Sequence, residues 1–185
     1  PANFKDNPSG YLDEIENVML PAIAEEGLAD YIDVFCEKGY FSLEDTERIL
    51  NAGKKHGLRP KIHVNQFNAF GGVALGVKYN ALSVDHLEVM NEEDFKALEG
   101  SDTIPTVLPS CSFFLRIPYA PARAMIDRGL PVALGTDYNP GSTPSGNIPF
   151  LLSLACIQQR LNPVEALNAA TINSAAAMEL QDTHG

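Results

Sequence analysis

Three side chains that can bind a metal ion lie at or near the ends of short apolar runs in this sequence. His63 and His86 each lie toward the end of such a run, and Asp137 closes the run Val132-Ala-Leu-Gly-Thr-Asp137. Imidazole nitrogen and carboxylate oxygen are the ligands of hydrolytic zinc or iron sites, which leave one coordination position open for water. One such residue alone has an ordinary explanation, as a core histidine or a turn-forming aspartate. Three at equivalent positions favour a metal-dependent active site.

The placement of these residues depends on a parallel β-sheet. Parallel strands covered on both faces are continuous apolar runs, and α/β enzymes carry their chemistry just past the carboxyl ends of such strands. The sequence after Asp137 is rich in Asn, Pro, Gly and Ser, which is typical of a loop at such an end. The three side chains are therefore expected to meet at one edge of a sheet.

The chain alternates strand-like runs with helical patterns. We predict strands at 31–36, around His63, around His86, at 104–110 and at 131–137. An amphipathic helix is expected near residues 10–27 and another at 42–56, where Ser42 and Asp45 have capping-box spacing. Further helices are predicted at 72–79, from about 91, at 121–128, at 148–160 and at 163–178. Strands alternating with helices predict a run of βα units and a single parallel sheet, with no internal domain boundary.

Composition excludes several classes of function. The formal charge of −11 argues against nucleic acid or an anionic membrane as a partner, because both need clustered basic residues. No apolar run reaches the length of a membrane span, and no signal peptide is visible. The three widely spaced cysteines do not form a disulfide framework and suit a reducing compartment. A cytoplasmic enzyme with a small-molecule substrate is the expectation.

Three motifs together resemble one known family. They are His63-Val-Asn-Gln66, Ser83-Val-Asp-His86 and Gly135-Thr-Asp-Tyr-Asn-Pro-Gly-Ser142. The resemblance is to the imidazolonepropionases, which are amidohydrolases of histidine degradation, and it extends over almost the whole chain. The last motif is the most specific, since Asn-Pro-Gly-Ser after the aspartate is close to a signature of this family.

This resemblance implies an α/β fold, the (β/α)8 TIM barrel of the metal-dependent amidohydrolases. Eight strands usually need ~250 residues, whereas this chain has 185 residues and five predicted strands. Residues 1–185 are therefore expected to be a partial barrel, a catalytic-domain fragment of a longer enzyme. The five strands would be the fourth to the eighth.

The resemblance also implies roles for individual residues. His63 and Asp137 would bind one metal ion, zinc or iron, and Asp137 would also be a catalytic proton acceptor. His86 would face the reacting ring as a second catalytic residue. The residues expected to contact the substrate or product are Gln66, Asn139, Gly141 and Ser142.

Gln66 departs from the pattern of those family members that have glutamate at this position. An amide cannot accept a proton from water at neutral pH, so Gln66 is expected to be a catalytic residue that orients the substrate and not a base. The family's His-x-His pair of metal ligands, one further histidine, and an arginine and a tyrosine from earlier segments are not in this sequence. The isolated chain is therefore expected to be inactive, and its open sheet edges favour self-association or a homo-oligomer.

The reaction implied is metal-dependent hydrolysis of the ring C–N bond of 4-imidazolone-5-propanoate, giving N-formimidoyl-L-glutamate. Another cyclic amidohydrolase or a deaminase of the same superfamily is an alternative, and so is a non-catalytic barrel remnant. Two nearby residues are expected to be outside the reaction. Cys111 has apolar neighbours and should be an inert thiol, and Asp85 should point to the opposite side of the strand from His86.

Overall fold

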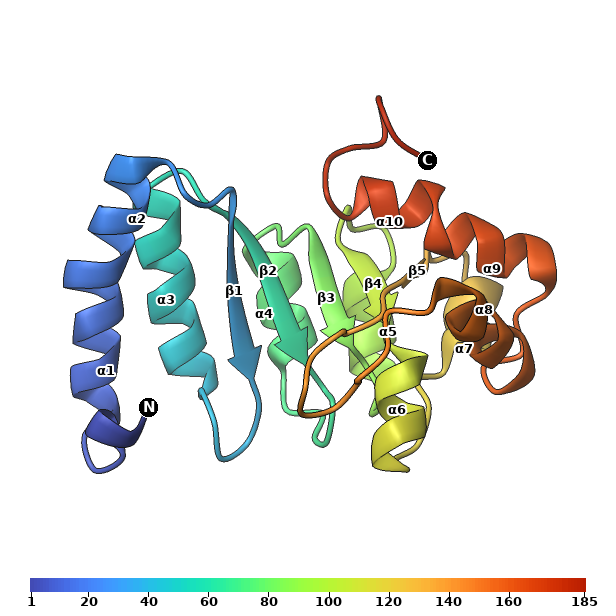
Figure 1. The fold of residues 1–185 in the computed structure, drawn as a ribbon, viewed down its shortest axis with the longest axis horizontal. Helices are drawn as coiled ribbons and strands as arrows, with labels where there is room; N and C mark the ends of the chain where they lie inside the picture. The colour runs from blue at the N-terminus through green and yellow to red at the C-terminus, as the bar shows by residue number, and fades with distance from the viewer.

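The computed structural model describes all residues from 1 to 185 and contains one five-stranded parallel sheet. The strands stand in chain order, β1 (Tyr31–Cys36), β2 (Arg59–Val64), β3 (Ser83–His86), β4 (Ile104–Val107) and β5 (Ala133–Leu134). Figure 1 shows β1 to β4 side by side and pointing the same way, so their carboxyl ends share one edge. This order confirms the predicted run of βα units. The outermost strands of the sheet are β1 and β5, and each has a neighbouring strand on one side only.

Helices follow each strand, and all but one of them were predicted from the sequence. They are α3 (Leu43–Lys55), α4 (Gly72–Lys78), α5 (Glu92–Leu98), α6 (Pro109–Leu115), α7 (Ala122–Asp127) and α8 (Ile148–Ile157). The capping box before α3 is present, because the Ser42 hydroxyl accepts from Asp45 N and the Asp45 carboxylate accepts from Ser42 N. Each of these bonds satisfies a backbone N–H donor at the helix start. None of the helices combines the length and the hydrophobicity needed to span a lipid bilayer.

The structure divides two of the predicted helices. The amphipathic segment is divided into α1 (Pro8–Glu14), a π-helical turn at Ile15–Met19 and α2 (Leu20–Glu26). Pro21 lacks the N–H that an uninterrupted α-helix would use, which explains the turn. The last predicted helix divides into α9 (Pro163–Ala170) and α10 (Ile172–Ala176), because Thr171 leaves helical geometry with ψ −87°.

The fourth and fifth strands are shorter than predicted. β4 ends at Val107, and Pro109 begins α6, a helix that the sequence did not predict. Proline is favourable in the first turn of a helix, where its missing N–H has no partner to lose. β5 has only two residues, so the segment that carries Asp137 is a loop.

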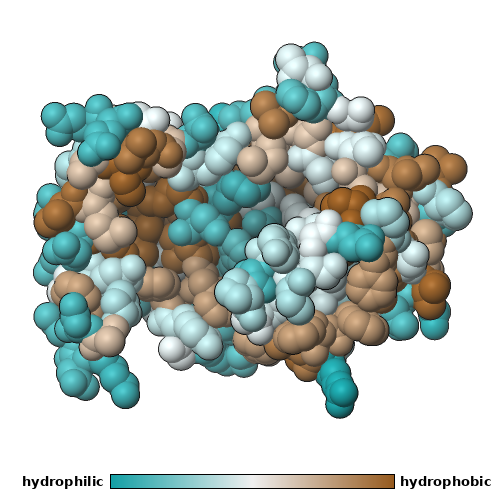
Figure 2. Space-filling view, in the orientation of Figure 1, coloured by the Kyte–Doolittle hydropathy of each residue, from teal (hydrophilic) through white to brown (hydrophobic).

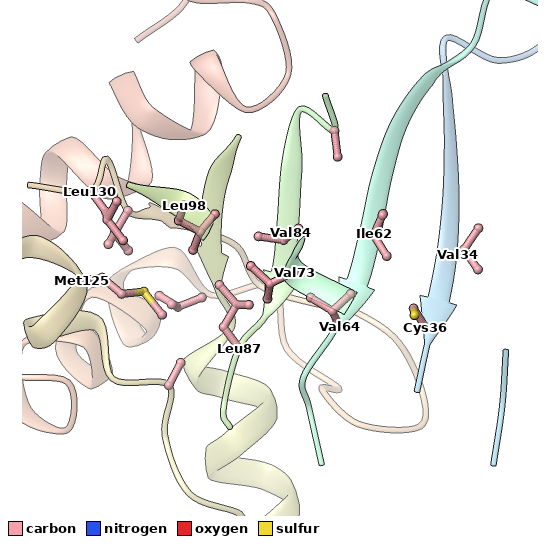
Figure 3. Packing of buried hydrophobic residues seen from close by; sticks show 14 of the residues in the cluster. Val34, Cys36, Ile62, Val64, Val73, Val84, Leu87, Leu98, Met125 and Leu130 are labelled. Atoms are coloured by element: carbon pink, nitrogen blue, oxygen red, sulfur yellow. The ribbon is translucent and has the colours of Figure 1, made fainter. Parts of the chain in front are cut away.

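The two faces of the sheet differ in chemistry. The side chains of Ile32, Val34, Ile62, Val64 and Val84 form the apolar face, and they are all buried. Figure 3 shows Ile62, Val64 and Val84 with Val73 and Leu87, and all five belong to the main core cluster. α4 packs closely on this face, since a Cβ atom at Gly76 would lie 2.7 Å from Val84 Cγ1.

The opposite face, called here the polar face, contains Asp33, Lys61, His63, Ser83 and Asp85. These residues alternate along β1 to β3 with the buried residues of the apolar face. Figure 2 shows hydrophilic side chains over the middle of the molecule and hydrophobic ones beside them. Lys61 Nζ donates to Ser83 Oγ and to Ala177 O, so the segment after α10 adjoins the amino-terminal part of this face.

Candidate metal centre

The structure brings His63, His86 and Asp137 together at the carboxyl edge of the sheet. One ligand atom from each of these side chains lies within 4.8 Å of the others. The ring centroids of His63 and His86 are 5.3 Å apart, and the planes are inclined by 56°. The three side chains that the sequence singled out therefore form one cluster, and their donor atoms are suited to zinc or iron.

Asp33 orients the His63 imidazole. His63 Nδ1 lies 2.9 Å from Asp33 Oδ1 and 2.8 Å from Asp33 Oδ2, so this carboxylate occupies one ring nitrogen and leaves Nε2 free. Burial by itself lowers the pKa of His63. The hydrogen bond and charge of Asp33, with the charges of Asp85 and Asp137, outweigh burial and raise that pKa to about 9. A histidine whose second nitrogen donates to a carboxylate is a common arrangement in metal sites.

The backbone at the end of β3 turns the His86 ring toward this cluster. His86 and Leu87 have φ of 85° and 66°, a left-handed conformation that costs non-glycine residues of order 1–3 kcal/mol each. In a regular strand, Asp85 and His86 would lie on opposite sides. That prediction is wrong here, because Asp85 Oδ2 is 4.0 Å from His63 Nδ1 while the His86 ring also faces His63. Asp85 instead accepts a hydrogen bond from Ser83 Oγ at 2.6 Å.

A tight loop after β5 holds Asp137. Asp137 has φ of 53°, and its Oδ2 accepts a hydrogen bond from Ser142 Oγ at 3.0 Å. The Asn139 amide donates to Asp137 O and Ser142 Oγ and accepts from the N–H groups of Gly141 and Ser142. The contacts of Asn139, Gly141 and Ser142 in this structure are therefore with one another and with Asp137. These hydrogen bonds form a loop that fixes the position of the Asp137 carboxylate.

Gln66 and Cys111 adjoin the cluster. Gln66 is buried, and its Nε2 lies 3.4 Å from Cys111 Sγ. Burial first, and then the charge of Asp137, raise the pKa of the Cys111 thiol to about 12. A thiol with such a pKa is neutral at physiological pH, as expected for an inert cysteine.

The sequence analysis missed two acidic residues of this region, Asp33 and Glu88. Asp33 is the one charged residue in the strand Tyr31–Cys36, at a position that alternation places beside the residues of the polar face. Glu88 follows His86 by two residues, and its side chain is fully buried. An isolated charge in an apolar strand, and a charge next to a candidate catalytic histidine, were the available signals.

Comparisons with solved structures define the class of fold. An adenosine deaminase from Xanthomonas campestris with bound zinc superposes with a TM-score of 0.73 at 15% identity, over 91% of this chain and 44% of that chain. A 5-methylcytosine deaminase from Klebsiella pneumoniae gives a TM-score of 0.74 at 16% identity, over 92% and 49%. The fold is thus that of the amidohydrolase (β/α)8 barrels, of which five βα units are present.

Comparisons of sequence show which proteins of this class the chain is similar to. The chain is 63% identical to the imidazolonepropionase of Flavobacterium johnsoniae over all 185 residues, and 46% identical to that of Geobacillus thermodenitrificans over 178 residues. It is a homologue of the imidazolonepropionases. The chain spans about 45% of the Flavobacterium protein and 42% of the Geobacillus protein. No protein-family model matches it.

Proposed function

We propose that this chain is the carboxyl-terminal part of the catalytic barrel of an imidazolonepropionase. The complete protein would hydrolyse the ring C–N bond of 4-imidazolone-5-propanoate to N-formimidoyl-L-glutamate. The observation that carries the proposal is the convergence of His63, His86 and Asp137 in a chain 43–63% identical to imidazolonepropionases. Because the chain corresponds to less than half of each relative, the activity belongs to the complete protein and not to these residues alone.

His63 and Asp137 are the residues that would hold the metal ion. The contact of His63 Nδ1 with Asp33 leaves Nε2 for coordination, and the Ser142 hydroxyl on Asp137 Oδ2 leaves Oδ1. This donor set fits zinc or iron, and further ligands would come from outside residues 1–185. When bound, such an ion supplies Lewis acidity that activates water at neutral pH.

Asp137 and His86 would move protons during the reaction. Asp137 can accept the proton of the attacking water and return it to the leaving ring nitrogen, because the loop holds its carboxylate at the cluster. His86, whose ring is turned toward His63, would stabilise charge that develops on the substrate oxygen. Gln66 would orient the ring through its amide, and Asn139, Gly141 and Ser142 would line the pocket.

The surroundings of the cluster support a small-molecule substrate. Buried Gln66 and Cys111 adjoin the cluster, and the loop of Asn139 forms one side. The edges of the open sheet at β1 and β5 are consistent with pairing to further strands of the complete barrel or to a second copy.

The test is hydrolysis of 4-imidazolone-5-propanoate by the complete protein that contains this chain. Asp137→Asn should lower kcat by roughly 10²-fold or more, since an amide cannot accept the proton. Asp102→Asn is the matched control, because Asp102 is exposed and precedes β4 at the opposite edge of the sheet. Hydrolysis that is unaffected by Asp137→Asn, or deamination of an amino-substituted ring in its place, would overturn the proposal.

A further inference from the structure

Glu88 is a buried carboxylate with no part in the reaction as described so far. Its side chain has no exposed surface, and it lies between the end of β3 and α6. Its Oε1 is 3.4 Å from His86 Nδ1 and accepts a hydrogen bond from Ser112 Oγ at 3.0 Å. Its Oε2 is buried without any hydrogen-bond partner.

The backbone around Glu88 is fixed on both sides. Leu87 N donates to Val64 O, and Val89 N donates to Asn65 O, so the turn is bound to the end of β2. Leu87 is fully buried in the main core. The left-handed backbone at His86 and Leu87 thus places the His86 imidazole beside the Glu88 carboxylate. Burial of Leu87 in the core fixes this arrangement.

Stability does not explain why a carboxylate occupies this position. A buried carboxylate with one unpartnered oxygen loses hydration that its two contacts restore only in part. An apolar side chain of similar volume would avoid this cost. A residue that is unfavourable for stability and adjoins a catalytic side chain points to function.

We propose that Glu88 is a positioning residue that holds the His86 ring and its Nδ1–H tautomer, so that Nε2 faces the cluster. This inference rests on the proposed function, because it assigns His86 to the reaction. A neutral imidazole carries one N–H, and an acceptor at Nδ1 decides which nitrogen bears it. Residues that orient a catalytic or metal-binding histidine in this way typically contribute 10- to 100-fold to activity or metal affinity.

The closing experiment compares Glu88→Met, Glu88→Gln and Ser112→Ala in the complete protein with 4-imidazolone-5-propanoate. Methionine keeps the volume and removes both acceptor oxygens, so kcat should fall by roughly 10- to 100-fold, with KM changed little and Tm unchanged or raised. Glutamine keeps one acceptor oxygen and should restore part of kcat. Ser112→Ala leaves the contact between His86 and Glu88 in place and should retain most of kcat.

A second readout is independent of turnover. ¹⁵N–¹H spectra of the His86 ring should show the Nδ1–H tautomer in the parent protein, and Glu88→Met should reduce it. An equal loss of kcat in Ser112→Ala and Glu88→Met would overturn the inference in favour of a role in anchoring α6. His86, Glu88 and Cys111 also have ligand atoms within 4.8 Å of one another. If the parent protein binds a second zinc ion that Glu88→Met loses, Glu88 is a metal ligand and the inference is overturned.

The same experiment separates this inference from the proposed function. If the parent protein does not hydrolyse the substrate, the proposed function fails, whatever the spectra of His86 show. If the parent protein is active and Glu88→Met keeps its full kcat, only the role of Glu88 fails.

Discussion

The apolar face of the sheet differs from the polar face in what determines its residues. On the apolar face, Ile62 and Val84 are fully buried under α4, and any side chain there must satisfy packing. On the polar face, Asp33, His63 and Asp85 interact through charge. The residues of the apolar face are required for folding, whereas those of the polar face are explained by the chemistry of the site. Changes on the two faces should therefore affect different measurements.

The largest effect on stability is expected from the apolar face. Ile62→Ala would leave a cavity under α4, because Ile62 has no exposed surface, and should lower the free energy of unfolding by about 2–5 kcal/mol. Urea unfolding of the complete protein would measure this. Ile157→Ala is the control, since Ile157 is 73% exposed, and it should change stability by roughly 0.5 kcal/mol or less. Equal effects of the two substitutions would contradict the assignment of the apolar face to the core.

A smaller effect on stability, with a distinct pH dependence, is expected from the polar face. The ordinary pKa of histidine is 6.5, and in the ion-free fold Asp33 contributes to raising the pKa of His63 to about 9. The folded protein then holds more protons than the unfolded chain between these values. The stability contributed by His63 is present below pH 6.5 and is lost as pH rises through 9.

Asp33→Asn should lower the pKa of His63 and flatten this pH dependence. NMR titration of the His63 ring in metal-free protein measures the pKa directly, and urea unfolding at pH 6.5 and pH 9 measures the stability. His184 is the internal control, because it lies in the exposed carboxyl-terminal tail. A His63 pKa that is unchanged by Asp33→Asn would show that another charge controls this ring.

Most of the scaffold could be predicted from the sequence. The strand at residues 31–36 and the capping box before α3 were predicted correctly, because both depend on local sequence patterns. The short β5 and the helix α6 could not be predicted from local patterns. The positions of Pro109 and of the Asp137 loop depend on tertiary contacts around the cluster.

The candidate site was predictable only in part. Strand-end position was enough to select His63, His86 and Asp137, because the ends of parallel strands converge. The contributions of Asp33 and Glu88 depend on cross-strand register and on the left-handed backbone at His86 and Leu87, which have no signature in residue type. The prediction for Asp85 failed for the same reason.

The most direct test of the account is the metal content of the complete protein. The account predicts zinc or iron in stoichiometric amount after purification without chelators, and at least a tenfold weaker affinity in both His63→Ala and Asp137→Asn. Asp102→Asn should bind metal as the parent does. Full metal content with unchanged affinity in both His63→Ala and Asp137→Asn would contradict the account.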